Sequence, residues 1–281
     1  MTTRVLRHVI RGAVWKNPVV SAMVHAADPI DLVALSISRR SFLPVLSTRM
    51  RASGPSLDFG GKNFVDGGRR TATLLRTWAG VTPDSKILEI GCSCGRNAIG
   101  LAEFLRDGNY TGMDIDNVAL GAARRNRLLR RKGFVFDFLD VRNDVYNPGG
   151  AFSASEYALP HPAESFDVVF LISVFTHMVT DEVRNYAEQI ARVLKPGGRC
   201  LVTAFLLDRP MQRQFPYRMQ EHSISSQEFP SLAVAYNFSF LAAAFAEHGM
   251  TSSSGPLWGK VHGDGALTPE VQDVMVFTKL S

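Results

Sequence analysis

Ile87-Leu88-Glu89-Ile90-Gly91-Cys92-Ser93-Cys94-Gly95-Arg96 is the stretch of sequence that decides the fold. Its first part is apolar enough to predict a buried strand, and the glycines that follow predict a tight turn into a helix over residues 96–105. Such a turn lets the backbone approach a ligand closely and aims free helix N–H groups at its polar atoms. Several cofactor classes are bound in this way, so the turn alone indicates only a nucleotide-like ligand.

On the C-terminal side of this turn, short apolar strands alternate with helical periodicity, which predicts a parallel sheet flanked by helices. Residues 206–237 follow a less regular pattern. The predicted strands cover residues 86–90, 110–114, 134–139, 166–172, 200–205 and 273–277, and the predicted helices cover 96–105, 117–131, 183–194 and 238–248.

On the N-terminal side, residues 1 to about 50 have the pattern of amphipathic helices, separated near Asn17-Pro18 and Asp28-Pro29. Arg11 interrupts the first apolar run, so the segment is not an ordinary secretory signal. Three interpretations stay open: a packing extension, a cap over a substrate site, and a helix lying on a membrane surface. The segment at residues 58–68 is dense in glycine and aromatic residues, which suits either a mobile lid or a plain linker.

The composition sets limits on the function. With 281 residues, of which 46% are hydrophobic, the chain can bury one large core and carry an appendage. Its continuous apolar runs are short, which favours a soluble protein. The three cysteines have no disulfide-framework spacing, which favours reduced thiols in the cytoplasm. The net charge of +5 comes mainly from the N-terminal segment and the run at residues 124–132, as in solvated helix faces, so a nucleic-acid partner is disfavoured. Cys92 and Cys94 do not have zinc-knuckle spacing, so no metal is expected.

Three acidic residues narrow the ligand of the glycine turn. Glu89 stands inside the turn motif, where it would repel a pyrophosphate but attract a cationic amino group. Asp114 ends the second predicted strand, where it can accept both hydroxyls of a ribose, and Asp140 follows the third, where it can meet an adenine amine. Strand ends of an open α/β sheet are where ligands bind, and these acids suit an amino acid joined to adenosine without phosphate.

Four ordered motifs between about residues 85 and 205 resemble those of class I S-adenosylmethionine-dependent methyltransferases of the small-molecule type. The resemblance implies a Rossmann-like, doubly wound, mostly parallel seven-stranded sheet with helices on both faces. It also implies a methyltransferase domain over residues 56–281, preceded by an N-terminal helical extension over 1–55. The motifs are residues 87–96, Gly112-Met113-Asp114-Ile115-Asp116, residues 159–169 and Val193-Leu194-Lys195-Pro196-Gly197-Gly198-Arg199.

The resemblance also implies roles for single residues toward S-adenosylmethionine. Residues of the first motif would hold the methionine part, Asp114 the ribose, Ile115 one adenine face, and Asp140 with Val141 the adenine edge. Two departures stand out: Ser93 replaces a usual glycine, which the turn tolerates if its φ is negative, and a long insertion at 142–157 allows residues 155–157 to share the adenine contact. The predicted cofactor-binding residues are Glu89, Gly91, Cys92, Gly95, Asp114, Ile115, Asp140, Val141 and Ser173.

The stretch after the fourth strand bears on the reaction. It lacks the Asn/Asp-Pro-Pro-aromatic motif of base-methylating enzymes and the cysteine nucleophile of pyrimidine methylation, which disfavours nucleic-acid bases. His177 lies just past the strand end, where it is either a general base for a hydroxyl or a histidine packing at the next helix start. Phe175 and Thr176 are candidate pocket residues beside it. Alternative bases are His161, His222 and His262, and Tyr236 and Trp258 are either pocket or core aromatics.

The sequence of residues 166–207 resembles that of bacterial methyltransferases found near glycan and glycolipid genes. The resemblance is strongest at Ser173-Val174-Phe175-Thr176-His177-Met178. It implies O-methylation of a hydroxyl on a small or amphiphilic acceptor, such as a sugar, glycolipid or natural product. N- or C-methylation of a small molecule, and a non-catalytic module that only binds S-adenosylmethionine, stay open as alternatives. The expected location is the cytoplasm, with peripheral contact to the inner membrane face through the N-terminal segment as a further option.

Overall fold

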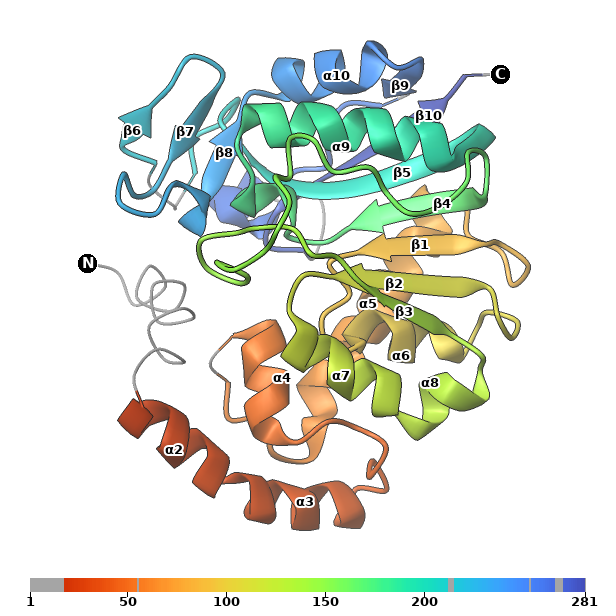
Figure 1. Ribbon diagram of the computed structural model, residues 1–281, viewed down its shortest axis with the longest axis vertical. Helices are drawn as coiled ribbons and strands as arrows, with labels where there is room; N and C mark the ends of the chain where they lie inside the picture. Colours follow the sequence, from red (N-terminus) through yellow and green to blue (C-terminus); the bar gives the residue numbers. More distant parts are fainter. Residues whose placement is uncertain (1–17, 55, 212–214, 253, 266–269, 281) are drawn as a thin grey trace. The chain divides into compact units, whose positions relative to one another are not determined.

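The computed structural model describes residues 18–54, 56–211, 215–252, 254–265 and 270–280. The chain divides into two compact units (Figure 1). Unit 1 comprises residues Met1–Leu74 and Cys92–Leu139, and unit 2 comprises Leu75–Gly91 and Asp140–Ser281. The amphipathic helix predicted before Asn17 lies outside the described residues.

The N-terminal part of unit 1 is helical, as the sequence predicts. Pro29 lies in the first turn of its helix, where a missing N–H removes no helical hydrogen bond. Asp58 accepts the backbone N–H groups of Asn63 and Phe64 and so caps the longest of these helices. The elements are α2 (Pro18–Ala26), α3 (Asp28–Ile37), α4 (Leu46–Ser53), the 3-10 turn η1 (Phe59–Gly61) and α5 (Lys62–Trp78), whose residues after Leu74 belong to unit 2.

The glycine-rich segment at residues 58–68 forms η1 and the start of α5, so it is largely helical, and its role as a lid or linker stays a prediction. Its glycines serve helix packing. A Cβ on Gly68 would lie 2.3 Å from the carbonyl oxygen of Arg96, and one on Gly100 would lie 2.3 Å from the backbone of Gly68. Only glycine lets these two backbones approach so closely.

The rest of unit 1 has the predicted strand–helix alternation. Its two strands, β2 (Tyr110–Asp114) and β3 (Val135–Phe138), pair in parallel. The single helix predicted over 117–131 is two helices, because Asn126 leaves the helical conformation and its side chain accepts the N–H groups of Leu128 and Leu129. Asparagine at this position therefore starts a new helix. The three helices are α6 (Arg96–Ala102), α7 (Asn117–Arg125) and α8 (Arg127–Arg131).

Unit 2 is built on a mostly parallel sheet. β1 (Ile87–Ile90) pairs in parallel with β4 (Phe166–Leu171), and β4 pairs in parallel with β5 (Leu194–Leu206). β10 (Asp273–Lys279) runs antiparallel along β5, which places a reversed strand beside the parallel ones. The helices α9 (Thr180–Val193) and α10 (Phe238–Ala246) pack together, as Figure 1 shows.

The irregular stretch at 206–237 adds short strands that the sequence did not reveal. They extend the sheet of unit 2 beyond β5, where β8 pairs in parallel and the next two are antiparallel. The described residues thus contain ten strands where seven were predicted. The short elements are β6 (Tyr217–Arg218), β7 (His222–Ile224), β8 (Val234–Tyr236), β9 (Met250–Ser252) and the 3-10 turns η2 (Phe175–His177), η3 (Pro230–Leu232) and η4 (Lys260–Gly265).

The burial of the strands follows from their composition. All four residues of β1 are buried, and β4 is buried except at Asp167. Near-continuous apolar strands are those that helices cover on both faces. The predicted α/β class is therefore confirmed by the parallel pairing and by the burial within each unit.

Candidate functional site

The glycine turn begins in unit 2, at the end of β1. Gly91 has a φ of +84°, a left-handed conformation that glycine adopts without strain. A Cβ at this position would lie 2.4 Å from Cγ2 of Val174, which follows β4. Both observations exclude a side chain at Gly91, so this part of the predicted motif is fixed by backbone geometry and packing.

The turn continues in unit 1 with residues 92–95. The N–H of Gly95 donates to the carbonyl of Cys92, and the carbonyl of Gly95 accepts the N–H of Ile99 at the start of α6. Gly95 has a φ of +83°, and a Cβ there would lie 2.8 Å from Leu129. The strand–turn–helix geometry predicted from the sequence is therefore present.

Ser93 does not meet the condition of a negative φ under which the turn would tolerate a side chain without strain. Its φ is +48°, in the left-handed region that non-glycine residues rarely adopt. Its backbone N–H donates to Oδ2 of Asp114 at 2.6 Å, which explains why the turn holds this conformation. Ser173, beyond the end of β4, has a φ of +62°. Strained backbone of this kind is concentrated at functional sites in proteins.

The strain at Ser93 gives a first prediction. Ser93→Gly is expected to raise the free energy of unfolding by about 1 kcal/mol, because it removes the steric penalty of a Cβ in the left-handed region. Ser93→Ala is the matched variant, since it removes the hydroxyl and keeps the Cβ. Urea unfolding checks this, and equal midpoints for the two variants would contradict the assignment of strain.

Asp114, at the end of β2, is a carboxylate held by backbone N–H groups of unit 1. It is buried, and its Oδ1 accepts the backbone N–H of Asp116 at 2.7 Å while Oδ2 accepts that of Ser93. Burial raises the pKa of Asp114 to about 6, against the opposing effect of these hydrogen bonds. A carboxylate has about four acceptor positions, which the backbone N–H groups of Ser93, Ile115 and Asp116 do not fill, so Asp114 can still accept from a ligand hydroxyl.

Asp116, the second acid of the same motif, has a structural role. It accepts the N–H groups of Val118 and Ala119 and so caps α7. Its other oxygen lies 2.5 Å from Nε of Arg51 in α4. Ile115 between the two acids is half-buried. The motif therefore offers one carboxylate and one apolar side chain to a ligand.

The cysteines of the turn are inert thiols. Cys92 and Cys94 are both buried. Burial raises the pKa of Cys94 to about 12, so the thiolate form needed for metal binding is disfavoured.

In unit 2, the predicted adenine residues lie in a loop that is closed by its own hydrogen bonds. Oδ1 of Asp140 accepts the N–H of Ala151 at 3.2 Å, and the carbonyl of Asp140 accepts the N–H of Phe152. Val141 is buried and forms a bridge with Phe152. The insertion at 142–157 is thus folded back on Asp140. Glu89 is fully buried on β1.

Ser173 belongs to a polar network that the sequence did not predict. Its N–H donates to Oγ1 of Thr203 at 2.8 Å, and its hydroxyl donates to Oε1 of Gln272 at 3.0 Å. Thr203 also donates to Gln272 at 2.7 Å. The hydroxyl hydrogen of Ser173 is therefore used within the protein. Toward a ligand, Ser173 can offer only the lone pairs of its hydroxyl oxygen and its backbone.

His177 has one ring nitrogen oriented by the backbone and one directed at a hydroxyl. Nδ1 lies 2.9 Å from the carbonyl oxygen of Ser231, so Nδ1 carries the proton and donates it. Nε2 lies 3.4 Å from the hydroxyl of Tyr146, and the two rings meet edge to face. In this tautomer Nε2 is the proton acceptor, the arrangement that a general base requires.

Tyr236 supports the turn that carries His177. Its buried hydroxyl donates to the carbonyl of Phe175 at 2.8 Å and also approaches the carbonyl of Met178. Burial raises the pKa of Tyr236 well above its usual range, so the phenol stays a neutral donor. Tyr236 is therefore a core residue and holds both ends of the turn around His177.

The alternative histidines have other surroundings. Both ring nitrogens of His262 are engaged, Nε2 with Asp273 at 2.9 Å and Nδ1 with the carbonyl of Pro210 at 2.8 Å. His161 packs edge to face on Phe166. Burial lowers the pKa of His222. Among the four candidates, His177 alone combines an oriented nitrogen with a second nitrogen facing a hydroxyl.

Part of the chain is similar to known methyltransferases. Residues 88–200 match the family described as a methyltransferase domain. The chain is similar to O-methyltransferase rstn1 of Aspergillus nomiae, with 29% identity over 44% of this chain and 48% of that protein. It is also similar to a fatty-acid O-methyltransferase of Mycolicibacterium smegmatis, with 29% identity over 42% of this chain and 36% of that protein. The chain thus spans half or less of these relatives' length.

Among solved structures, the chain is similar to a SAM-dependent methyltransferase of Methanosarcina mazei. The TM-score is 0.50, the identity is 20%, and the match covers 74% of this chain and 97% of that one. At this identity the similarity concerns the fold, and it confirms the predicted Rossmann-like fold.

Proposed function

Since residues 88–200 form a methyltransferase domain, we propose that the chain is an S-adenosylmethionine-dependent methyltransferase acting on a hydroxyl group. The acceptor in this proposal is a small or amphiphilic molecule, such as a sugar, glycolipid or natural product. The proposal rests on the domain match, on the acids at the strand ends, and on His177.

The acids have the chemistry that the cofactor needs. S-adenosylmethionine, when bound, supplies an activated methyl group on a sulfonium. Asp114 would accept the ribose hydroxyls with the acceptor positions that its backbone hydrogen bonds leave open. Glu89 would accept the amino group, and Asp140 with Val141 would flank the adenine. The backbone of Gly91, Cys92, Gly95 and Ser173, with the side chain of Ile115, completes the proposed set.

The observation that carries a hydroxyl acceptor is the tautomer of His177. An alcohol loses its proton as it is methylated, so a positioned acceptor atom accelerates the reaction. Nε2 of His177 is such an atom, because the Ser231 carbonyl holds the proton on Nδ1. The acceptor hydroxyl would then take the place of the Tyr146 hydroxyl beside Nε2, or lie between the two groups and contact both. N- or C-methylation would depend less on such a base.

The amphiphilic character of the acceptor is supported by the name of one relative, a fatty-acid O-methyltransferase. Methylation of an oxygen atom is supported by that name and by the name of O-methyltransferase rstn1. The predicted division of the chain is part of the proposal: a helical extension over residues 1–55 and a methyltransferase domain over residues 56–281. A cytoplasmic location with peripheral contact to the inner membrane face belongs to the same proposal.

The raised pKa of Asp114 gives a second prediction. Ribose hydroxyls donate more strongly to a carboxylate than to a neutral acid, so binding favours the ionised form. The affinity for S-adenosylmethionine is expected to rise with pH through about 6 and to level off above about 7. Below the pKa, each pH unit should weaken binding by up to about tenfold. Calorimetric titrations across this range check it, and a slope that persists in Asp114→Asn would contradict it.

The function is tested by release of S-adenosylhomocysteine from S-adenosylmethionine. The substrates are a panel of long-chain alcohols, hydroxylated and free fatty acids and glycolipids, with long-chain amines as the matched alternative. We expect product with a hydroxyl acceptor. Turnover of amines alone would redirect the assignment to N-methylation, and cofactor binding without any turnover would favour a non-catalytic module.

A further inference from the structure

An apolar stripe runs along the outer side of α2 and α3. Its members follow one another at spacings of four and three residues, so they lie on one face of the two consecutive helices. Met23, Ile30 and Ile37 are 69%, 65% and 80% exposed. We define the apolar stripe as the exposed residues Val19, Met23, Ala26, Ile30, Val33 and Ile37.

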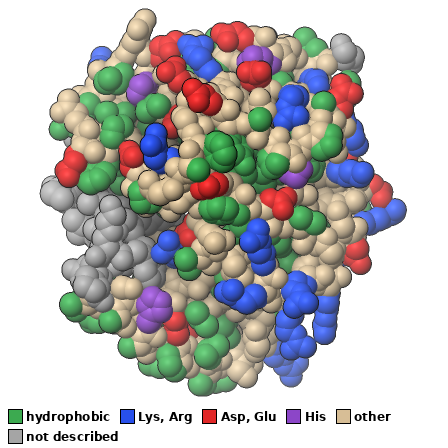
Figure 2. Space-filling model, in the orientation of Figure 1, with side chains coloured by type: hydrophobic (Ala, Val, Ile, Leu, Met, Phe, Trp, Pro, Cys, Tyr) green, Lys and Arg blue, Asp and Glu red, His purple; other side chains and the backbone are tan. Residues whose placement is uncertain are grey.

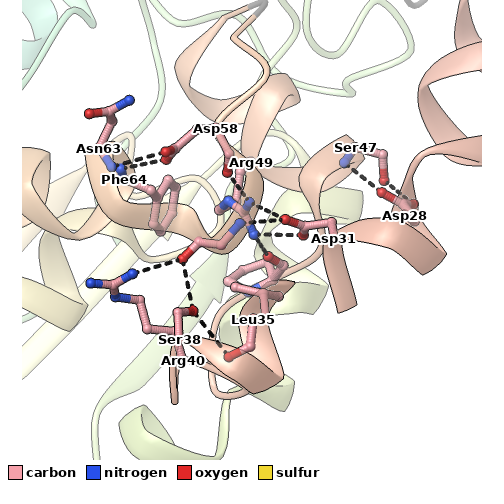
Figure 3. A network of polar contacts seen from close by, with 12 residues as sticks. Asp28, Asp31, Leu35, Ser38, Arg40, Ser47, Arg49, Asp58, Asn63 and Phe64 are labelled. Atoms are coloured by element: carbon pink, nitrogen blue, oxygen red, sulfur yellow. Dashed lines mark hydrogen bonds and ion pairs between the residues drawn. The ribbon is translucent and has the colours of Figure 1, made fainter. Parts of the chain in front are cut away.

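The inner side of α3 is fixed to unit 1 by buried polar contacts, which Figure 3 shows. Asp31 forms a two-pronged ion pair with Arg49 of α4, with N–O distances of 2.8 and 3.0 Å, and both side chains are almost fully buried. Asp31 also accepts the N–H of Gly60. Asp28 accepts the N–H and the hydroxyl of Ser47. The stripe therefore faces outward on a helix whose orientation is set.

These contacts favour α2 and α3 lying on a membrane surface over their crossing the membrane. In the described residues, the helical stretch Val19–Ile37 is long and apolar enough to cross a membrane, contrary to the expectation from run lengths. Crossing would break the Asp31–Arg49 pair and move Asp28 and Asp31 into hydrocarbon, which is strongly unfavourable. A helix that keeps its polar side on the protein and its apolar side outward suits the interface of a bilayer.

A group of exposed arginines lies beside this region in the same unit. Asn126, between α7 and α8, donates to the carbonyl of Phe42, which follows α3, at 2.8 Å. Figure 2 shows hydrophobic side chains along the lower edge, over α2 and α3, and Lys and Arg side chains continuing that edge over α8. We define the basic edge as the exposed residues Arg39, Arg124, Arg125, Arg127, Arg130 and Arg131.

The charge of the two units supports an anionic partner. Lys and Arg outnumber Asp and Glu by 19 to 9 in the sequence of unit 1, whereas Asp and Glu outnumber Lys and Arg by 17 to 12 in unit 2. The positive charge is thus concentrated in the unit that carries the apolar stripe. Apolar side chains next to arginines match the acyl boundary and the headgroups of an anionic leaflet.

We propose that the apolar stripe and the basic edge together dock unit 1 on the surface of an anionic lipid bilayer, with α2 and α3 lying in the plane of the interface. The membrane contact predicted for the N-terminal segment is thereby assigned to these two sets of side chains on the protein and to anionic lipid in the bilayer. This assignment holds whichever molecule accepts the methyl group, because neither set of residues takes part in the proposed chemistry.

Vesicle co-sedimentation of the full chain tests the docking surface. The vesicles are phosphatidylcholine alone or phosphatidylcholine with phosphatidylglycerol. We expect binding to the anionic vesicles that weakens with salt, and far weaker binding to the neutral ones. The triple variant Met23→Ser, Ile30→Ser, Ile37→Ser and the triple variant Arg127→Gln, Arg130→Gln, Arg131→Gln should each bind at least about tenfold more weakly.

Matched controls remove exposed side chains of the same types from unit 2. They are Met219→Ser, Val271→Ser, Leu280→Ser for the stripe and Arg142→Gln, Arg199→Gln, Arg218→Gln for the basic edge. Both should bind within about twofold of the unaltered chain. Absence of binding to anionic vesicles, or equal losses in test and control variants, would overturn the proposal. So would a dimer that the stripe variant converts to a monomer without any vesicle binding. No cofactor or acceptor is needed, so these outcomes leave the methyltransferase proposal untouched.

Discussion

Asp114→Ala is expected to weaken the binding of S-adenosylmethionine by at least about a hundredfold, because it removes the acceptor of two ribose hydroxyls. Hydrogen bonds to a charged group contribute about 1.5–3 kcal/mol each, and two such bonds account for a loss of this size. The carboxylate is buried at the end of β2 and held by the backbone N–H groups of Ser93 and Asp116. A side chain fixed in this way binds without losing further freedom. Titration calorimetry measures the effect.

The same substitution leaves two backbone N–H groups without their acceptor, so the fold of the variant has to be checked. Asp114→Asn is the second variant, since it keeps the shape and removes the charge. Asp107→Ala serves as the control, because the side chain of Asp107 is 71% exposed and pairs with Lys132 at the surface of unit 1. Near-normal affinity in a folded Asp114→Ala or Asp114→Asn protein would remove the ribose role.

His177→Ala is expected to lower kcat by a factor of about 10² to 10⁴ with an unchanged Kd for S-adenosylmethionine. The reason is the loss of the proton acceptor Nε2, which the Nδ1 contact with Ser231 holds in position. Turnover of the best hydroxyl acceptor from the substrate panel is the measurement, with cofactor binding measured on the same samples.

The control for this variant is His248→Ala, which alters a histidine beyond α10, outside the proposed site. It should keep its turnover. If His177→Ala also keeps its turnover, His177 is a packing residue of the turn, the alternative that its position allows. If His177→Ala loses cofactor binding as well, the turn around His177 has a structural role in the cofactor site.

The sequence predicted those parts of the fold that depend on local composition. β1 and β4 are found where continuous apolar residues predicted buried strands. The helix over 117–131 was predicted as one, because apolar residues keep their spacing across Asn126 while its side chain caps the next helix. Short strands such as β6 and β8 were missed, because two or three residues carry too little pattern and their pairing is decided by distant chain.

The candidate site shows the same division. Asp114 and His177 follow strand ends, and their positions could be predicted from the motifs. The hydrogen-bond partners of the site residues could not be predicted, because they are distant in the sequence. Ser173 bonds to Gln272, which is 99 residues away, and His177 bonds to Ser231, which is 54 residues away. The left-handed conformation of Ser93 could not be predicted from the sequence either, which left the sign of its φ open. Tertiary contacts hold that conformation, through the hydrogen bond to Asp114.

The most direct test of the central proposal is calorimetric titration of the unaltered chain with S-adenosylmethionine, with S-adenosylhomocysteine and ATP as comparison ligands. We expect saturable binding of S-adenosylmethionine and S-adenosylhomocysteine to one site per chain, and weaker binding of ATP, whose phosphates Glu89 would repel. A titration without saturable heat up to millimolar S-adenosylmethionine would contradict it.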